Sequence, residues 1–317
     1  EQSGVNIHCN VRIGEAISFE ELKNQSDAVY VAIGTQQSRT LGIPGEDLPG
    51  VENGLIFLKR IGLKQSLSVP ERLVVIGGGS TAMDVARTAV RLGSKEVPVV
   101  YRRTEREMPA GAEEVKEARE EGIRIITLAS PVRITEKDGA VCGIELVKRQ
   151  LTDYGPDGRR RSAHIEGSEF LLECDGIITA INQDVDHKFH QTTQLDFDRK
   201  GRIDVHQFTS RTSEEGVFAG GDTSPWGANV AVNAIADGKK AAVNIDKYLG
   251  GSGELNMGEW LEIPVIPDME VTEPHMRFPV RTLPVDERID NFKEVACGFH
   301  KLDAIGEAFR CLHCDRR

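Results

Sequence analysis

The glycine-rich stretch at residues 77–82 is the part of this sequence whose residue types and spacing most clearly imply chemistry. It reads Gly77, Gly78, Gly79, Ser80, Thr81, Ala82 and has the form G-x-G-x-x-A. In this pattern the first glycine permits a sharp turn out of a strand, and the second lets a pyrophosphate approach the backbone. Ala82 is small enough for tight packing of a helix against a sheet. The pattern predicts a dinucleotide-binding turn at a helix N-terminus; the alternative is a glycine-rich turn without a ligand.

Two consecutive arginines, Arg102 and Arg103, follow the glycines at the distance where the ribose of a nucleotide is recognised. NAD-binding sequences usually carry an Asp or Glu there, which accepts hydrogen bonds from the ribose hydroxyls. Glu96 and Glu105 lie outside that position. Guanidinium groups instead suit a 2′-phosphate, so the sequence favours NADP. The alternative is a pair of solvated surface arginines.

The residues around the glycines predict the elements that must position them. The run Leu73–Ile76 is apolar enough for a buried strand, and the apolar residues between Met83 and Leu92 recur at helical spacing. Gly93 ends this helix, and a β-rich run at 97–101 leads to the arginine pair. This order is that of a βαβ unit.

Composition limits the class of protein. The 317 residues contain 39% apolar and 28% charged residues, as an ordinary globular protein does. A net charge of −11 disfavours nucleic acid or an anionic membrane as a partner. No apolar run approaches the roughly 20 residues that span a bilayer. Six cysteines, scattered except for one pair, favour a reducing compartment and hence a cytoplasmic location.

Further strands and helices are predicted on both sides of this unit. Apolar runs end in Gly34, in Ile181 and Asn182, and in Gly221 and Asp222, and a long helix is expected over 228–249. We expect a charged, solvent-facing helix over 113–121 and two strands around the Asp138-Gly139 turn. Prolines beyond residue 250 predict an extended tail with little core of its own, ending in a short helix.

Five stretches together carry a resemblance to a known family: residues 27–34, 41–47, 74–87, 100–110 and 216–242. They resemble the NADPH-dependent, FAD-containing oxidoreductases typified by the small (beta) subunit of bacterial glutamate synthase. Related flavin subunits of electron-bifurcating complexes share this architecture. The resemblance covers nearly all of residues 1–250.

The resemblance implies an α/β fold with two Rossmann-like domains of the pyridine nucleotide-disulfide oxidoreductase type, the NADPH domain being inserted in a partial FAD domain. The implied segments are a partial FAD-binding domain and linker (1–70), the NADPH-binding domain (71–182), the returning FAD segment (183–250) and a C-terminal tail (251–317). Gly34, Ile181 and Asn182 are implied cofactor contacts. In the returning segment Asp222 would accept hydrogen bonds from the ribityl chain beside Gly221, and the helix N-terminus at Asn229, Val230 and Ala231 would face the flavin.

Two features of this chain depart from the family. The family's N-terminal FAD fingerprint is missing, and the sequence begins without an initiator Met. We expect a fragment, a flavin that is held weakly or not at all, or completion of the site by another chain. Asn182 stands where the family often has glycine. Asn is second only to glycine in its tolerance of positive φ, so we expect the same turn to form with Asn182.

The pair Cys311 and Cys314 resembles the start of an iron–sulfur segment in this family. A [4Fe–4S] cluster takes four thiolates, so the cluster would be complete only in a longer protein. A zinc or redox pair and two free thiols are the alternatives. Cys9, Cys142 and Cys174 are expected to be buried.

The resulting hypothesis is a flavin oxidoreductase module that passes electrons from NADPH through FAD to iron–sulfur centres, an iron–sulfur protein or a partner subunit. Hydride transfer between cofactors requires no catalytic acid or base, and none is expected. The alternative is a non-catalytic NADP(H)-binding or assembly module with an incomplete flavin site.

Overall fold

The computed structural model describes residues 4–155, 158–226, 230–254 and 276–310. Its chain divides into two compact units, which are described separately. Unit 1 combines residues 1–39 with 182–260, and unit 2 combines 40–181 with 261–317. The functional boundaries expected from the resemblance stay predictions, because they rest on which ligand each segment binds.

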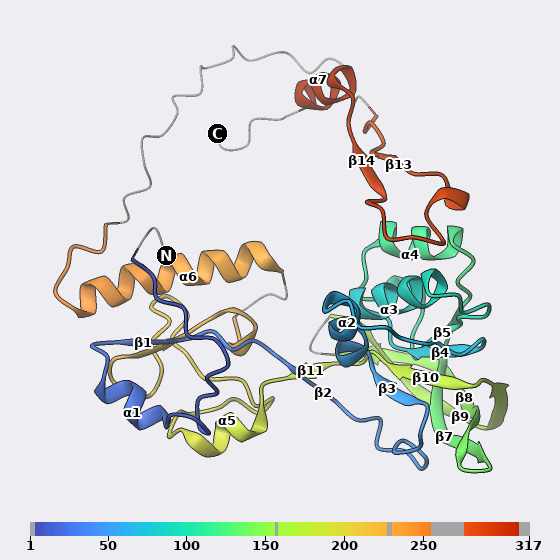
Figure 1. Ribbon diagram of the computed structural model, residues 1–317, viewed down its shortest axis with the longest axis horizontal. Coiled ribbons are helices and arrows are strands. Elements are labelled where there is room, and N and C mark those ends of the chain that lie inside the picture. The colour runs from blue at the N-terminus through green and yellow to red at the C-terminus, as the bar shows by residue number, and fades with distance from the viewer. Residues whose placement is uncertain (1–3, 156–157, 227–229, 255–275, 311–317) are drawn as a thin grey trace. The chain divides into compact units, whose positions relative to one another are not determined.

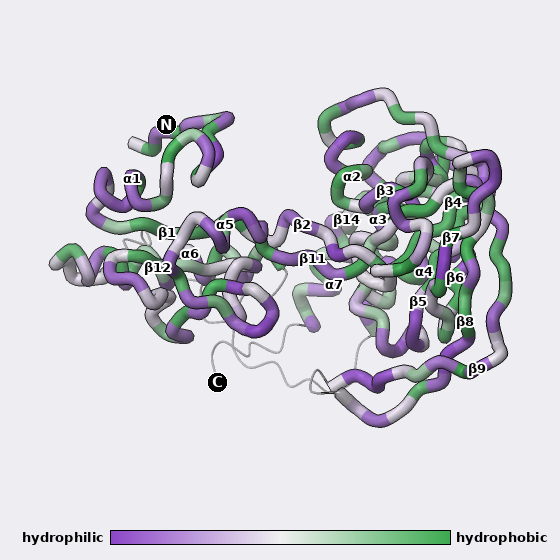
Figure 2. The backbone as a smooth tube through the Cα atoms, turned by 90° about the horizontal axis from the view of Figure 1, so that it is seen from below, coloured by the Kyte–Doolittle hydropathy of each residue, from purple (hydrophilic) through white to green (hydrophobic). Residues whose placement is uncertain are grey.

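Unit 2 is built around a five-stranded sheet in which every neighbouring pair is parallel (Figure 1). The three inner strands are buried along their whole length, because other elements cover both faces of the sheet. This explains why the sequence of β4 is a continuous apolar run, drawn as a hydrophobic segment in Figure 2. In spatial order the strands are β3 (Val51–Asn53), β10 (Gly176–Thr179), β4 (Leu73–Ile76), β5 (Val99–Tyr101) and β6 (Ile125–Thr127).

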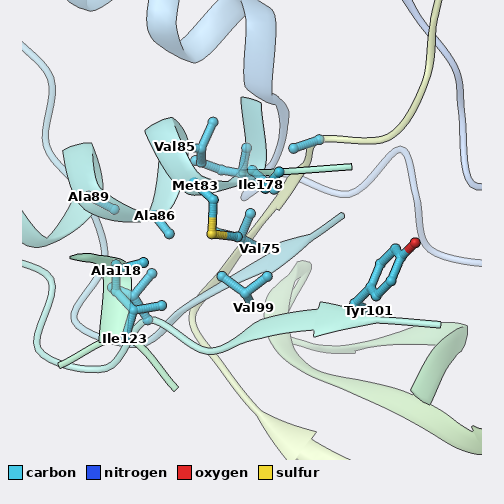
Figure 3. Packing of buried hydrophobic residues seen from close by; sticks show 14 of the residues in the cluster. Val75, Met83, Val85, Ala86, Ala89, Val99, Tyr101, Ala118, Ile123 and Ile178 are labelled. Carbon is cyan, nitrogen blue, oxygen red and sulfur yellow. The ribbon is translucent and has the colours of Figure 1, made fainter. Parts of the chain in front are cut away.

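Three helices cover one face of this sheet: α2 (Gly54–Gly62), α3 (Ser80–Arg91) and α4 (Ala112–Glu120). Figure 3 shows Met83, Val85, Ala86 and Ala89 of α3 packed toward the valines of β4 and β5. The apolar spacing predicted for this helix is therefore confirmed.

An antiparallel sheet covers the other face of the parallel sheet (Figure 1). Asp138 and Gly139 form the turn between its first two strands with φ of +54° and +79°. Two positive φ values are typical of a tight hairpin turn, as the Asp-Gly sequence predicts. The strands are β7 (Ala129–Lys137), β8 (Ala140–Tyr154) and β9 (Arg160–Glu173).

Unit 1 joins two segments that are far apart in the sequence. Strand β1 (Val29–Val31) pairs in parallel with β12 (Val217–Ala219), and Phe19 and Phe189 pack edge to face in the core beneath them. Ser18 caps the first helix in a capping box with Glu21. The remaining elements are α1 (Phe19–Asn24), β2 (Gln37–Ser38), β11 (Gln183–Asp184), α5 (His187–Thr192), η2 (Gly221–Thr223) and α6 (Ala231–Tyr248).

None of the helices within the described ranges combines the length and apolar character needed to cross a bilayer.

The described part of the C-terminal tail, residues 276–310, is more structured than the sequence predicts. Its Arg288 side chain is only 1% exposed and pairs with Glu120 at 2.7 Å. The tail is therefore anchored to unit 2, and its last element is a short helix, as the sequence predicts. Their elements are β13 (Arg281–Thr282), η3 (Val285–Glu287), β14 (Ala296–Gly298) and α7 (Lys301–Phe309).

The anchor depends on Glu121, whose side chain is 0% exposed at the end of α4. Arg87 and Arg91 of α3 each hold its carboxylate with two hydrogen bonds of 2.7–3.0 Å, and Arg288 lies 3.3 Å away. The expectation that residues 113–121 face solvent is thus wrong at the C-terminal end of the helix. Burial opposes ionisation of Glu121, but the two arginines outweigh it and hold its pKa below its usual value.

We predict that Glu121→Gln destabilises the protein by about 3 kcal/mol or more, because it leaves buried guanidinium groups without their counter-charge. Urea unfolding measures the loss. The matched control is Glu113→Gln, which removes an exposed pair between Arg277 and Glu113. The control should change the free energy of unfolding by less than about 0.5 kcal/mol.

The effect of Glu121→Gln should also depend on pH. Because the pKa of Glu121 is lowered in the folded state, its contribution is complete above the unfolded pKa of about 4.3 and is lost as pH falls through the folded value. The stability difference between wild type and variant should therefore narrow below about pH 4. A difference that stays constant from neutral to acidic pH would contradict this account.

Candidate nucleotide-binding site

Two of the three glycines after β4 are required by close packing. Gly77 has a φ of +154°, and a Cβ atom there would lie 2.2 Å from the carbonyl oxygen of Ala180. A Cβ atom on Gly78 would lie 2.4 Å from the ring of Tyr101. Any side chain at either position would collide with the adjacent strand ends. Gly77 and Gly78 are therefore needed for the chain to form this turn.

Gly79 differs from its two neighbours because it borders open space. A Cβ atom there would meet only Pro109, at 3.9 Å. Gly79 is the N-cap of α3, so the positive end of the helix dipole lies beside this space. The position predicted for pyrophosphate is therefore open and lies at a helix N-terminus. Ala82 is completely buried, in agreement with its predicted packing role.

The two other residues of the turn differ in exposure. Ser80 is exposed, and its hydroxyl donates to Glu114 at 3.0 Å. Thr81 is half-buried in the first turn of α3.

The arginine pair lies at the end of β5, on the same sheet edge as the glycine turn, because β4 and β5 are parallel neighbours. Arg102 is exposed, whereas Arg103 is only 8% exposed. The hydroxyl of Tyr101 donates to the carbonyl of Glu107 at 2.7 Å and fixes the chain that follows the pair. The structure therefore gives the two guanidinium groups different environments at this edge.

A third arginine, Arg149 of β8, was not anticipated from the sequence. Its guanidinium is close enough to Arg102 and Arg103 for their charges to lower its pKa, in addition to the larger effect of burial. Its neighbours in sequence show only strand-like alternation, so pattern alone gives no signal for it. Only the pairing of β8 with β7 brings it to this edge.

The strand β10 continues into Ile181 and Asn182, which belong to different units. Ile181 packs against the core between the parallel and the antiparallel sheet of unit 2. Asn182 belongs to unit 1, and its carbonyl accepts from the Arg39 N–H at 3.0 Å. Its φ is not positive, so the reason given for tolerating Asn in place of glycine is wrong. An ordinary backbone conformation suffices there.

Unit 1 brings Gly34 and the segment around Asp222 to one sheet edge, since β1 and β12 pair in parallel. Gly34 and Gly221 have φ of +65° and +69°, which favours glycine at both positions. The Gly34 N–H donates to the Thr223 hydroxyl at 2.7 Å, and the Gly221 N–H donates to buried Asp237 at 3.0 Å.

Asp222 itself is half-buried, and among the described residues its carboxylate has neither a hydrogen-bond donor nor an ion-pair partner. It can therefore accept hydrogen bonds from a ligand hydroxyl, as the resemblance implies.

The N-terminus of α6 is exposed. Val230 is its N-cap and is 53% exposed, and Ala231 is its first residue. Asn229, the third residue expected here, lies outside the described residues.

The predicted metal ligands Cys311 and Cys314 also lie outside the described residues. Within the described ranges, no group of three or more potential ligands could hold a metal ion. The other cysteines there are free thiols. Cys174 is buried, which raises its pKa to about 12, and Cys142 is partly buried. Cys9 is exposed, so its predicted burial is wrong.

Comparison with known proteins gives a consistent result. The sequence model of the family described as pyridine nucleotide-disulphide oxidoreductase matches residues 2–238. The chain is 37% identical to the NADP(+)-dependent formate dehydrogenase subunit beta of Moorella thermoacetica over 99% of its own length and 46% of the relative's. It is 35% identical to the glutamate synthase [NADPH] small chain of Halomonas elongata over 78% of its length and 55% of the relative's.

A solved structure of Mycobacterium tuberculosis FprA in complex with NADPH matches with a TM-score of 0.63 and 23% identity. The match covers 76% of this chain and 68% of that one. It confirms the α/β fold predicted from the resemblance. The chain spans about half the length of the curated relatives it matches.

We predict that Gly79→Ala leaves the fold intact but weakens NADPH binding about tenfold or more, because the methyl group fills the open space at the helix N-terminus. Its free energy of unfolding should change by less than about 1 kcal/mol. Thermal unfolding and nicotinamide fluorescence titration measure the two effects. Gly77→Ala is the contrasting variant and should lose about 2 kcal/mol or more of stability. Unchanged NADPH affinity in Gly79→Ala would contradict the assignment of Gly79.

Proposed function

The chain belongs to the pyridine nucleotide-disulphide oxidoreductase family, and from this premise we propose that it is the NADPH- and FAD-binding module of an oxidoreductase that delivers electrons to iron–sulfur centres or a partner subunit. Membership confirms the resemblance found in the sequence, since the matched relatives include a glutamate synthase small chain. When bound, NADPH supplies a hydride and the flavin divides its two electrons into single-electron steps. The protein supplies binding and orientation.

The observation that carries this proposal is the edge of the parallel sheet in unit 2. The open space at Gly79 and the N-terminus of α3 suit a pyrophosphate. Arg102 and Arg103 lie at the same edge and suit a 2′-phosphate, whereas NAD sites place an acid there. We therefore assign residues 77–82 and the two arginines to NADP(H). Ile181 and Asn182 are further cofactor contacts that the family resemblance implies.

The residues of unit 1 support a partial flavin site. No donor among the described residues bonds to the Asp222 carboxylate, so it can accept from a ribityl hydroxyl, and positive φ at Gly34 and Gly221 allows close approach of the backbone. We assign the helix N-terminus at Asn229, Val230 and Ala231 to the flavin ring, where its dipole would favour the negative charge of the reduced form.

We propose that the electron acceptor is an iron–sulfur centre or a partner subunit. Two matched relatives are named a subunit beta and a small chain, which supports a partner subunit or iron–sulfur protein as acceptor. We propose that Cys311 and Cys314 are two of the four thiolate ligands of a [4Fe–4S] cluster in the full protein. Free thiols at Cys142 and Cys174 support a reducing, cytoplasmic location. The charge of −11 argues against nucleic acid or anionic lipid as partners.

We predict that Arg102→Gln lowers NADPH affinity roughly 10- to 100-fold, as expected for the loss of a charged hydrogen bond to phosphate. NADH affinity should stay unchanged, because NADH lacks the 2′-phosphate. Competition titration with both nucleotides measures the ratio. Arg106→Gln is the control, since Arg106 is an exposed arginine of the same loop. Equal NADPH affinity in wild type and Arg102→Gln would refute the arginine assignment.

The visible spectrum of the chain after incubation with FAD separates the enzyme from a non-catalytic module. We predict that the protein retains flavin through a gel-filtration step and that NADPH bleaches the flavin band under anaerobic conditions. Bleaching should be much slower with NADH. A colourless protein that still binds NADPH would support the assembly module instead.

A further inference from the structure

The carboxyl ends of β5 and β6 are connected to the antiparallel sheet through one residue, Leu128. Its N–H donates to the carbonyl of Arg103 at 3.1 Å, and its own carbonyl accepts from the N–H of Arg149 at 2.8 Å. Leu128 has a φ of +53°, which is strained for a bulky side chain. This conformation is where the chain turns from β6 into β7. Two consecutive backbone hydrogen bonds therefore link Arg149 to the arginine pair.

The guanidinium group of Arg149 is held in a defined position by two serines. Its Nε donates to the hydroxyl of Ser162 at 2.8 Å, and its Nη1 donates to the hydroxyl of Ser130 at 3.0 Å. A further donor of the group bonds to the carbonyl of Ser162. Ser130 is only 9% exposed and comes from β7, whereas Ser162 comes from β9. Arg149 is thus fixed between its two neighbouring strands.

The surroundings of Arg149 disfavour the positive charge of its guanidinium group. Burial and repulsion from Arg102 and Arg103 both lower its pKa. Among the described residues, neither Arg102 nor Arg149 pairs with a carboxylate. A partly buried guanidinium group that has no carboxylate partner is favourably placed to bind an anion. A phosphate monoester carries about 1.5 to 2 negative charges at neutral pH and accepts several hydrogen bonds.

We propose that Arg149 is a specificity-determining residue that binds the 2′-phosphate of NADP(H) together with Arg102 and Arg103. The inference rests on the proposed NADP(H) function and deepens it. Arg149 reaches the phosphate from the antiparallel sheet, whereas the other two reach it from the end of β5. Arginines from both sheets then contribute to the preference for NADP(H) over NAD(H). The backbone of Leu128, with its positive φ, sets the position of Arg149 relative to the arginine pair.

The test compares two probes that differ only in the 2′-phosphate, namely 2′,5′-ADP (adenosine 2′,5′-bisphosphate) and 5′-AMP. Calorimetric titration of the whole chain gives the ratio of their affinities. Wild type should prefer 2′,5′-ADP, and Arg149→Gln should lower this preference roughly tenfold or more. The affinity for 5′-AMP should remain unchanged. Arg149→Lys, which keeps the charge, should recover part of the preference. Arg133→Gln is the matched control, because Arg133 is an exposed arginine of β7 that pairs with Glu145.

The results distinguish failure of the role proposed for Arg149 from failure of the proposed NADP(H) site. If wild type prefers 2′,5′-ADP and Arg149→Gln keeps that preference, the role of Arg149 is overturned and NADP binding stands. A variant that binds both probes more weakly by the same factor would show a structural role only and would also overturn it. If wild type does not distinguish the probes, both the proposed NADP site and the role of Arg149 are wrong.

Discussion

The close approach of Gly77 to the carbonyl of Ala180 is the contact on which the turn that we assign to nucleotide binding depends. Strands β4 and β10 pair so tightly that no side chain fits between their ends. The chain must therefore leave β4 through glycine and enter α3 within three residues. This places Gly79, which borders open space, at the helix N-terminus. The room for a phosphate is thus a consequence of how two strands pack.

Parallel pairing determines which residues can act together in unit 2. Because all five strands run the same way, their carboxyl ends gather the glycine turn, the arginine pair and the turn at Leu128 at one edge. The antiparallel sheet extends this edge by adding charge from a different layer. Positive charge accumulates there because serine hydroxyls, and not carboxylates, hold the guanidinium of Arg149.

Helix α3 has a second role at its other end. Its N-terminus faces the predicted phosphate position, while Arg87 and Arg91 near its C-terminus hold the buried Glu121. Arg288 of the C-terminal segment joins the same ionic cluster. The described segment that precedes Cys311 and Cys314 in the sequence is therefore anchored at the C-terminal end of α3. A buried charge cluster of this kind is stable only when every member is present.

The sequence alone determined the βαβ unit, the Asp-Gly hairpin and the family, because each depends on local spacing: strand and helix periods, turn residues and the glycine pattern. Its errors concern contacts between residues far apart. Charged residues 113–121 are typical of a solvent-facing helix, yet Arg87, Arg91 and Arg288 bury Glu121. Cys9 lies on a strand-like run but is exposed. Only the tertiary structure brought Arg149 to the arginine pair. The pairing of β8 with β7 and the hydrogen bonds of Leu128 place it there, and neither leaves a periodic signal in the sequence.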